Sequence, residues 1–391
     1  MMKILSVAWS IYDDRIKEFS ANYTGGGVVI KNLCEYIGRN EKSYLFIGAF
    51  KIPAMRLGNI NIVDTISLPS YIDNSLEKNE HRLQEMEAAF ELTLERLSPD
   101  IVNFHGKGIL AKRCIDVCCK RNVPYVYTEH LYIGMEEKIV GYNLDIEWEK
   151  GIFSTPGIQV IAVSNGMKKK ILGDWPQLSD DCVKAISNGT DFHAERIDSN
   201  LIKQYKLQDS KILLCVGTVL ERKNQLQLVS SFQLLPQNIQ RNLKIIICGK
   251  DKMAGKLQQE ISDNGLDDKI IYAGAFPGSE LKKYYTIADG LIMPSLAEGL
   301  SIAALEAISY GIPVIMFSDS ECADDLNDER VVCFAKQRSD ICLAKSMEEW
   351  FFKEWDKNYI IDYSKYFSME RMAKDYIAYY KKRLKDEEKE R

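Results

Sequence analysis

The sequence has little of what a metal centre or a disulfide framework needs. Among its 391 residues there are four histidines, and none of the ten cysteines belongs to a CxxC pair, so the spacings typical of a zinc site are missing. Cys114, Cys118 and Cys119 fall in a stretch with a helical pattern. We therefore expect reduced, buried thiols in a cytosolic protein, with neither a metal nor another cofactor.

An excess of positive charge and a long apolar run are missing as well. Lysine and arginine number 51 against 56 acidic residues, which gives a formal charge of −5. No nucleic-acid partner is expected, because no net basic field would neutralise its phosphates. No apolar stretch reaches the roughly 18 residues of a membrane-spanning helix. The apolar start, MMKILSVAWS, soon meets Asp13 and Asp14, so we expect a first buried strand and a cytoplasmic location.

Short apolar runs alternate with helical patterns along nearly the whole chain, which is typical of βαβ units and parallel sheets. The expected strands of a first series are Lys3–Ala8, Ser43–Gly48, Ile101–Phe104, Tyr125–Thr128 and Val160–Val163. Those of a second series are Ile212–Gly217, Leu243–Cys248, Ile270–Tyr272, Gly290–Met293 and Val314–Phe317. Two such series predict an α/β fold with two Rossmann-like, doubly wound domains and a crevice between them.

The turn signal Asn188-Gly189 lies near the expected boundary between the two domains. We place the first domain at residues 1–185 and the second at residues 186–365. A final helix with a charged end, over residues 366–391, is expected to pack back across the domain junction.

The most informative stretch is IMPSLAEGLSIAALEAISYGIPVI, residues 292–315. It predicts a strand, a polar turn and a helix over about residues 300–309, which a glycine and a proline then end. A helix that starts at the carboxyl end of a parallel strand is suited to an anion, because its dipole and free backbone N–H groups both favour negative charge. Ser301 and Ile302 would supply those N–H groups.

Glu298 and Glu306 lie eight residues apart in the same stretch. If both were helical, about 12 Å along the axis would separate them, which is wider than the roughly 5–9.5 Å of a glycosidase acid and base pair. They fit better as residues that grip two ends of an extended ligand. The alternative is that both are solvated helix carboxylates.

The pattern PSxxEGLSIxxLEAxxxGxPVI, with its Glu-x7-Glu spacing, resembles the signature of glycosyltransferase family four. That family is a retaining group with the GT-B fold, in which two Rossmann-like domains face a central cleft. The resemblance implies that Glu306 binds the ribose hydroxyls of a donor nucleotide and that Glu298 lies at the donor sugar. It also places Leu300, Ser301 and Ile302 at the donor.

The stretch VGTVLERKNQ, residues 216–225, presents two adjacent cations, Arg222 and Lys223, after a predicted strand. Such a pair could neutralise a diphosphate, although an isolated pair is usually a surface feature. The stretch resembles the GRLxxxKG segment of the family, in which the lysine holds the donor diphosphate. Thr218 stands where many members carry arginine, and Arg222 is the candidate to replace that arginine.

Three glycines in TGGG, residues 24–27, open a helix after the first strand. They would let a ligand approach the backbone closely, or they form only a flexible turn. The motif resembles a glycine loop that the family places near the donor phosphate and the acceptor, with Gly25 and Gly26 as the matching residues. The Glu-Arg that commonly follows this loop is absent here.

Two histidines, His105 in NFHG and His130 in YTEH, end predicted strands of the first domain. Ligands of doubly wound folds bind at that edge, whereas a lone histidine is more often structural. The TEH segment resembles the family position whose histidine contacts the donor sugar, so His130 ranks above His105. The YAGAF segment resembles the stretch that flanks the nucleotide base, through backbone groups near Ala275 and Phe276.

Together these resemblances imply a retaining glycosyltransferase of hexosyltransferase type that needs no metal. Its donor would be a nucleotide-diphosphate sugar, with a UDP-sugar as the commonest donor in the family. Its acceptor would be a saccharide or a lipid-linked saccharide, in the synthesis of bacterial surface polysaccharide or glycoconjugate. The first domain would bind the acceptor and the second the donor.

Two other functions stay open at this point. A nucleotide-sugar epimerase or a phosphorylase could use the same fold. A non-enzymatic nucleotide-sugar-binding protein is disfavoured, because both candidate cations and both glutamates are present.

A peripheral membrane contact at the inner face of the membrane is also an open expectation. Lys168–Lys170 precede Ile171, Leu172 and Trp175, which indicates a basic and apolar surface. A solvated helix end is the equal alternative.

Overall fold

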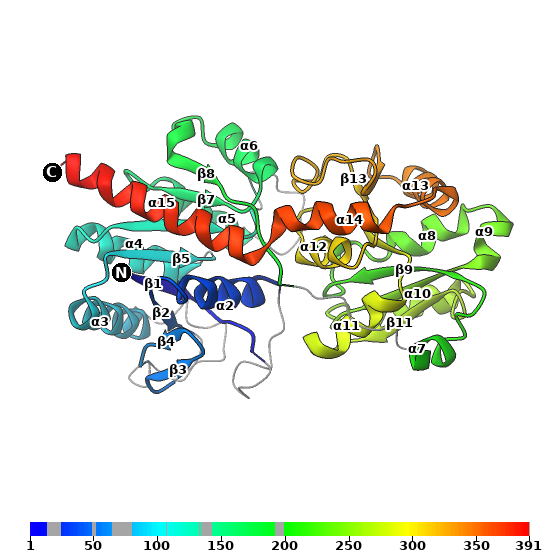
Figure 1. Cartoon of the computed structure of the whole chain (residues 1–391), viewed down its shortest axis with the longest axis horizontal. Helices are drawn as coiled ribbons and strands as arrows, with labels where there is room; N and C mark the ends of the chain where they lie inside the picture. The colour runs from blue at the N-terminus through cyan, green and yellow to red at the C-terminus, as the bar shows by residue number, and fades with distance from the viewer. Residues whose placement is uncertain are drawn as a thin grey trace. The chain divides into compact units, whose positions relative to one another are not determined.

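The structure is a computed structural model that describes residues 1–13, 25–48, 52–64, 80–106, 108–132, 134, 143–191 and 199–390. The chain divides into two compact units. The first consists of Met1–Gly189 together with Met369–Arg391, and the second of Thr190–Ser368. Each unit has its own sheet, with helices packed on it (Figure 1).

The first unit contains an eight-stranded sheet in the order β3-β4-β2-β1-β5-β6-β7-β8. Its elements are β1 (Lys3–Ala8), α2 (Gly25–Ile37), β2 (Lys42–Ile47), β3 (Met55–Leu57), β4 (Ile60–Ile62), α3 (Glu80–Leu97), β5 (Ile101–His105), α4 (Ile109–Arg121), β6 (Tyr125–Glu129), α5 (Asn143–Phe153), β7 (Val160–Ala162), α6 (Asn165–Asp174), β8 (Val183–Ala185) and α15 (Met369–Glu390). All neighbouring strands are parallel except β3, which is antiparallel to β4. The strand order reverses between β1 and β5, where doubly wound folds bind ligands.

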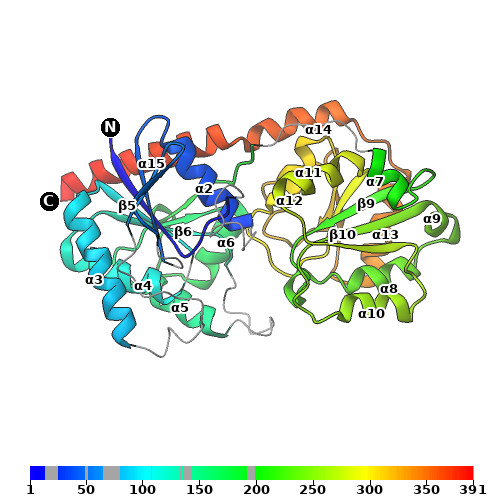
Figure 2. The same cartoon turned by 90° about the horizontal axis from the view of Figure 1, so that it is seen from below.

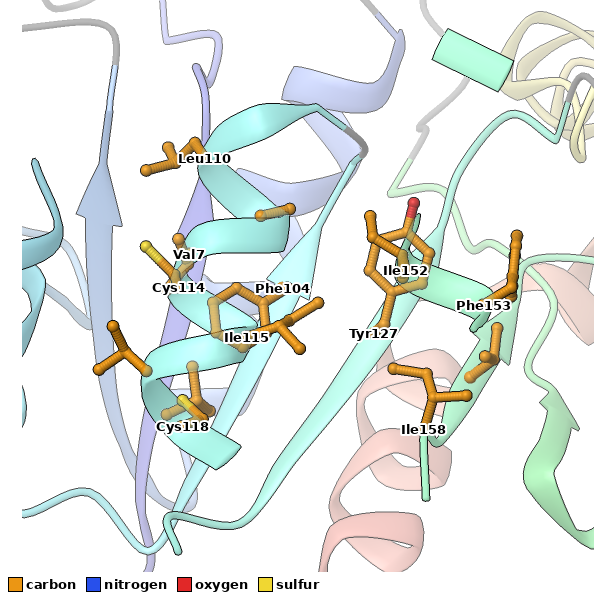
Figure 3. Packing of buried hydrophobic residues seen from close by; sticks show 14 of the residues in the cluster. Val7, Phe104, Leu110, Cys114, Ile115, Cys118, Tyr127, Ile152, Phe153 and Ile158 are labelled. Atoms are coloured by element: carbon orange, nitrogen blue, oxygen red, sulfur yellow. The ribbon is translucent and has the colours of Figure 1, made fainter. Parts of the chain in front are cut away.

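The core of the first unit forms where the apolar faces of α4 and α5 meet the sheet. Figure 3 shows α4 side chains packed against strand residues, and α5 residues beside Tyr127; labelled are Val7, Phe104, Leu110, Cys114, Ile115, Cys118, Tyr127, Ile152, Phe153 and Ile158. Burial raises the pKa of the Cys114 thiol well above its usual value, so that it stays protonated. Cys119, which was expected to be buried, is exposed because it does not lie on the inner face of α4.

The second unit contains a six-stranded, fully parallel sheet in the order β11-β10-β9-β12-β13-β14. Its elements are α7 (Ser199–Gln204), β9 (Lys211–Val216), α8 (Gln227–Gln233), α9 (Gln237–Asn242), β10 (Leu243–Cys248), α10 (Lys256–Asp263), β11 (Ile270–Gly274), α11 (Gly278–Ile287), β12 (Gly290–Met293), α12 (Ile302–Ser309), β13 (Val314–Phe317), β14 (Val332–Ala335), α13 (Asp340–Phe352) and α14 (Lys357–Ser364). The order reverses between β9 and β12, as in a dinucleotide-binding fold. In Figure 2, α8 and α10 cover one face of this sheet, while α11 and α12 cover the other.

The segment that indicated a membrane-facing surface is folded differently from that expectation. Ile171 and Trp175 are buried in the core of the first unit, and Leu172 packs against that core. Lys168 forms an ion pair with Asp180 at 2.7 Å. The apolar half of the expected patch is therefore not at the surface. In the described part of the chain, no helix has the length and apolar character to cross a membrane.

Candidate functional site

The candidate site of the second unit lies at the carboxyl edge of its sheet, where β9 and β12 end side by side. The segment after β9 carries Arg222 and Lys223, and the segment after β12 carries Glu298. Parallel strands place their carboxyl ends at one edge, so residues 75 positions apart in sequence come together at the point where strand order reverses.

One carboxylate serves both cations in this cluster. Lys223 Nζ donates a hydrogen bond to Glu298 Oε1, and Arg222 Nη1 lies 3.6 Å from the same oxygen. The side chains of Arg222, Lys223 and Glu298 are 12%, 16% and 9% exposed. Arg222 also joins the two segments, because its Nη1 donates to Ala297 O at 2.5 Å and its carbonyl accepts from Leu296 N at 2.8 Å. The cluster carries a net charge of +1, which suits a phosphate.

Burial of Glu298 opposes ionisation, but the charges of Lys223 and Arg222 outweigh it. Together with hydrogen bonds from Lys223 and Ser295, they hold the pKa of Glu298 below its usual value. Glu298 is therefore a carboxylate at neutral pH. It lies in the loop before α12 and not in the helix, so the helical spacing to Glu306 does not apply.

Glycines follow both β9 and β10, where the backbones approach each other closely and Lys223 lies beside Gly217. A Cβ on Gly249 would lie 1.9 Å from the carbonyl oxygen of Gly217, so only glycine fits there. Gly217 has φ 147°, and a Cβ on it would lie 3.3 Å from Lys223 Cε. Thr218 follows, and its carbonyl accepts a hydrogen bond from the buried Gln225 at 3.1 Å. Sequence reasoning missed Gly249 and Gln225; a glycine directly after each of two neighbouring strands was the available signal.

The start of α12 differs from the prediction. The helix begins at Ile302, and Ser301 is its N-cap, with Oγ accepting from Ala304 N at 3.4 Å. The backbone N–H of Ser301 donates to Cys322 Sγ at 3.4 Å, so it is not free for an anion as expected. Leu300, just before the cap, is buried. Ile302 occupies the first helical position, whose N–H has no partner within a helix.

Glu306 is buried in the middle of α12, with 4% of its surface exposed. Tyr285 of α11 donates a hydrogen bond from Oη to Glu306 Oε2 at 2.7 Å. Burial raises the pKa of Glu306 to about 7, while the Tyr285 hydrogen bond and the charge of Lys282 oppose this rise. Because Glu298 is buried too, neither glutamate is a solvated helix carboxylate. Tyr285 is a further residue that sequence reasoning missed, since nothing in the linear pattern pairs it with Glu306.

Ala275 and Phe276 directly follow β11 at the same edge of the sheet, two strands from β9. Ala275 is exposed and Phe276 half-buried. The Phe276 ring lies against Tyr284, with centroids 4.7 Å apart and planes tilted by 34°. This places an aromatic ring and an exposed alanine at the edge of the sheet where β9 and β12 also end.

The candidates of the first unit lie at the carboxyl ends of β5 and β6 and at the start of α2. His105 Nδ1 lies 3.1 Å from His130 Nε2, so the two histidines that the sequence ranked separately form one pair. Burial lowers the pKa of both, His130 to about 4, so both rings are neutral at pH 7. Gly25 and Gly26 open α2, and a Cβ on Gly26 would meet nothing within 4 Å, so packing does not require glycine there. Thr24 lies outside the described residues.

The expected site residues thus fall into two groups, one in each unit. His130, Gly25 and Gly26 belong to the first; Arg222, Lys223, Thr218, Ala275, Phe276, Glu298, Leu300, Ser301, Ile302 and Glu306 belong to the second. Direct contact among them is found for Arg222, Lys223 and Glu298. Across the residues that the structure describes, no group of three or more His, Cys, Asp or Glu side chains could hold a metal ion.

Comparison with known sequences adds to this geometry. Residues 198–366 match the family model of the glycosyl transferases group 1. An uncharacterized glycosyltransferase of Methanocaldococcus jannaschii is 28% identical over 239 residues, covering 57% of this chain and 60% of the relative. O-antigen chain mannosyltransferase B of Escherichia coli is 27% identical over 133 residues, 34% of this chain and 35% of the relative.

A GDP-mannose-dependent alpha-(1-6)-phosphatidylinositol monomannoside mannosyltransferase of Mycolicibacterium smegmatis is also similar, at 28% identity over 120 residues. That match covers 29% of this chain and 31% of the relative. All three matches therefore span less than two thirds of the relatives' length.

Solved structures resemble the chain over almost its full length. A glycosyltransferase from Rickettsia africae matches with a TM-score of 0.73 and 15% identity, covering 98% of this chain and 99% of that chain. Sucrose-phosphate synthase from Thermosynechococcus elongatus matches with a TM-score of 0.76 and 15% identity, covering 97% and 98%. The chain has the two-domain GT-B fold, and the match to the glycosyl transferases group 1 lies entirely within its second unit.

Proposed function

We propose that this protein is a glycosyltransferase that moves a sugar from a nucleotide-diphosphate sugar to a hydroxyl of a saccharide or lipid-linked saccharide. The observation that carries the proposal is the contact of Arg222, Lys223 and Glu298 where β9 and β12 end. It brings two cations and a carboxylate to the edge of a doubly wound sheet at which ligands bind, within the unit that matches the family model.

The proposed reaction breaks the bond between the anomeric carbon and the β-phosphate oxygen and forms a bond from that carbon to the acceptor oxygen. The acceptor oxygen attacks from the face that the diphosphate leaves, and its proton passes to the leaving phosphate. No protein nucleophile is then needed, and the same-face attack retains the anomeric configuration. The leaving diphosphate gains negative charge in the transition state. Lys223 and Arg222 are placed to stabilise that charge, with the start of α12 as a further contribution.

We propose that these protein cations take the part that a metal ion plays in other transferases. Turnover should therefore continue in EDTA with no divalent ion added. Complete loss of activity that manganese or magnesium restores would contradict a metal-independent reaction.

The names of the relatives indicate which donor sugar and nucleotide base should be tested first. Two of those compared are mannosyltransferases by name, and one of them is GDP-mannose-dependent. GDP-mannose is therefore the first donor to test, and UDP-sugars, the commonest donors in the resembling family, are the second. The names of the relatives also favour an acceptor that belongs to a surface polysaccharide or a glycolipid.

A thermal-shift screen tests the proposal, since a ligand that binds only the folded state raises the unfolding temperature. GDP-mannose, UDP-sugars and ADP-sugars are compared on the wild type and on Lys223→Ala. One donor should raise the wild-type Tm, and the same donor should raise that of Lys223→Ala less. No shift with any donor would contradict the proposal. Conversion of the donor to an epimer without acceptor would identify an epimerase instead, and binding without turnover a non-enzymatic protein.

A further inference from the structure

Tyr285 of α11, in the second unit, has its side chain against α12, and its hydroxyl forms a hydrogen bond with Glu306. The ring is buried and stacks on Tyr310 at the end of α12, with centroids 5.7 Å apart and planes within 20°. Its Oη donates to Glu306 Oε2 at 2.7 Å. Because a buried, stacked tyrosine has little freedom, this hydrogen bond fixes the direction of the Glu306 carboxyl.

The two carboxyl oxygens of Glu306 differ in their hydrogen bonds. Oε2 is taken by Tyr285, while the described residues supply no hydrogen-bond donor to Oε1. A ribose presents two neighbouring hydroxyls, each of which can donate a hydrogen bond to a carboxylate oxygen. A carboxylate held at one oxygen by the protein is thus presented to the ribose in one orientation.

The surroundings of Glu306 make its ionisation depend on few groups. Burial disfavours the charged form, and Tyr285 and Lys282, both on α11, favour it. The other elements that pack on α12 are β12, β13 and α14. In the described part of the chain these add no charge to the Glu306 surroundings. Lys357 of α14 lies with its carbonyl oxygen and Cβ beside Gly311, beyond the end of α12.

We propose that Tyr285 is a positioning residue for donor binding, which holds Glu306 as an oriented carboxylate for the ribose hydroxyls. The inference rests on the proposed function, because it assigns a nucleotide sugar to this site. It predicts that donor affinity depends on pH. Burial places the pKa of Glu306 at about 7, so donor should bind more tightly as the pH rises from 6 to 8.5.

The experiment measures the Kd of the donor that passes the thermal-shift screen by titration calorimetry, from pH 6 to pH 8.5. The phosphates of a nucleotide sugar do not titrate in this range, so a pH dependence belongs to the protein. The wild type should show a midpoint near neutral pH. Tyr285→Phe keeps the ring and its stacking but loses the hydroxyl that donates a hydrogen bond to Glu306. The pH midpoint of nucleotide-sugar binding should therefore move up. A move of about one pH unit would weaken binding about 5-fold at pH 7 and less than about 2-fold well above the new midpoint.

Two variants provide controls. Tyr284→Phe, one position earlier on α11, loses a hydroxyl that lies 3.1 Å from Tyr205 Oη and does not contact Glu306, so it should keep the wild-type midpoint. Glu306→Gln cannot ionise and should bind donor weakly without the pH dependence.

The outcomes separate this inference from the proposed function. If no donor binds the wild type, both are overturned. If donor binds but Tyr285→Phe weakens it equally at every pH, or behaves as Tyr284→Phe does, the role of Tyr285 is structural and only this inference is overturned. A wild-type Kd that is constant between pH 6 and pH 8.5 would overturn it as well.

Discussion

Lys223 is the residue whose substitution should lower the rate of the proposed reaction most. Its ammonium contacts Glu298 and lies beside Gly217 at the end of β9. If it stabilises the leaving diphosphate, Lys223→Ala should lower kcat by roughly 10²–10³-fold, the usual scale for one lost electrostatic donor. Steady-state kinetics at saturating donor measure this. Lys252→Ala, at an exposed lysine nearby, should leave kcat unchanged. A Lys223→Ala variant that changes the donor KM alone would show that the lysine binds donor without helping the transition state.

Glu306 should also make the free energy of unfolding depend on pH. Its pKa is raised from 4.5 in the unfolded chain to about 7 in the folded one, so the folded chain holds the proton more tightly. The stability contribution is therefore fully present below about pH 4.5 and is lost as the pH rises through 7, by up to about 3 kcal/mol. Glu306→Gln has no such term. Urea unfolding at pH 5, 6, 7 and 8 should show the variant gaining on the wild type as the pH rises. A constant difference between the two would contradict the raised pKa.

The residue contacts of the site were the part that sequence could not supply. The identities of Arg222, Lys223, Glu298 and Glu306 follow from motifs and a resemblance, and the edge at which they lie follows from the parallel sheet. That Glu298 bonds Lys223, or that Tyr285 bonds Glu306, depends on loop conformation and on helix packing. No local pattern in the sequence encodes either.

At the scale of elements, α15 shows how the end of the chain is joined to the first unit. It packs against α2, and Figure 1 shows it beside the first sheet. Tyr380 of this helix accepts a hydrogen bond from the buried Asn103 Nδ2 at 2.7 Å, and Asn103 Oδ1 accepts from Thr128 at 2.9 Å. The helix therefore completes a buried hydrogen-bond network with side chains of β5 and β6.

Removing that hydroxyl should destabilise the first unit. Tyr380→Phe leaves the buried amide of Asn103 without this partner, which costs about 1–3 kcal/mol. Urea unfolding measures the loss, with Tyr366→Phe as control because Tyr366 is exposed. Equal stability of the two variants would mean that the amide finds another partner when the hydroxyl is absent.

The elements that sequence predicted best are four strands in the interior of the two sheets. These strands have the expected bounds, because a buried parallel strand is a short, bounded apolar run. They are Lys3–Ala8, Leu243–Cys248, Gly290–Met293 and Val314–Phe317. The strands β3, β4 and β8 have three residues each with a polar residue in the middle, so no apolar run marks them, whereas the equally short β7 is wholly apolar and was predicted. The prediction also omits β14, although VCFA is an apolar run of the expected kind. Ser301 as N-cap starts α12 two residues later than predicted, because the residue three positions on is alanine and no capping box marks the start.

At the scale of the whole molecule, the candidate residues lie in two units, and this predicts a motion. The nucleotide site is proposed mainly on the second unit, while the acceptor site and the donor-sugar contact of His130 are expected on the first, so productive binding should bring the units together. Small-angle X-ray scattering should show a smaller radius of gyration with saturating nucleotide sugar than without it. Identical curves in the two conditions would contradict closure, and Glu306→Gln at the same donor concentration should stay like the free protein.

The carboxylate shared by Lys223 and Arg222 has a consequence for the end of the catalytic cycle. In the proposed reaction, the nucleoside diphosphate left after transfer would bind Lys223 and Arg222, the two cations that Glu298 contacts in the structure. Because Glu298 is tethered beside these cations, we expect it to compete with the diphosphate at high effective concentration and so to favour product release. Product inhibition should accordingly be weak in the wild type and stronger in Glu298→Gln, where nothing charged returns to the cations. The residue at the donor sugar would then also help set the rate at which the site becomes available for the next donor.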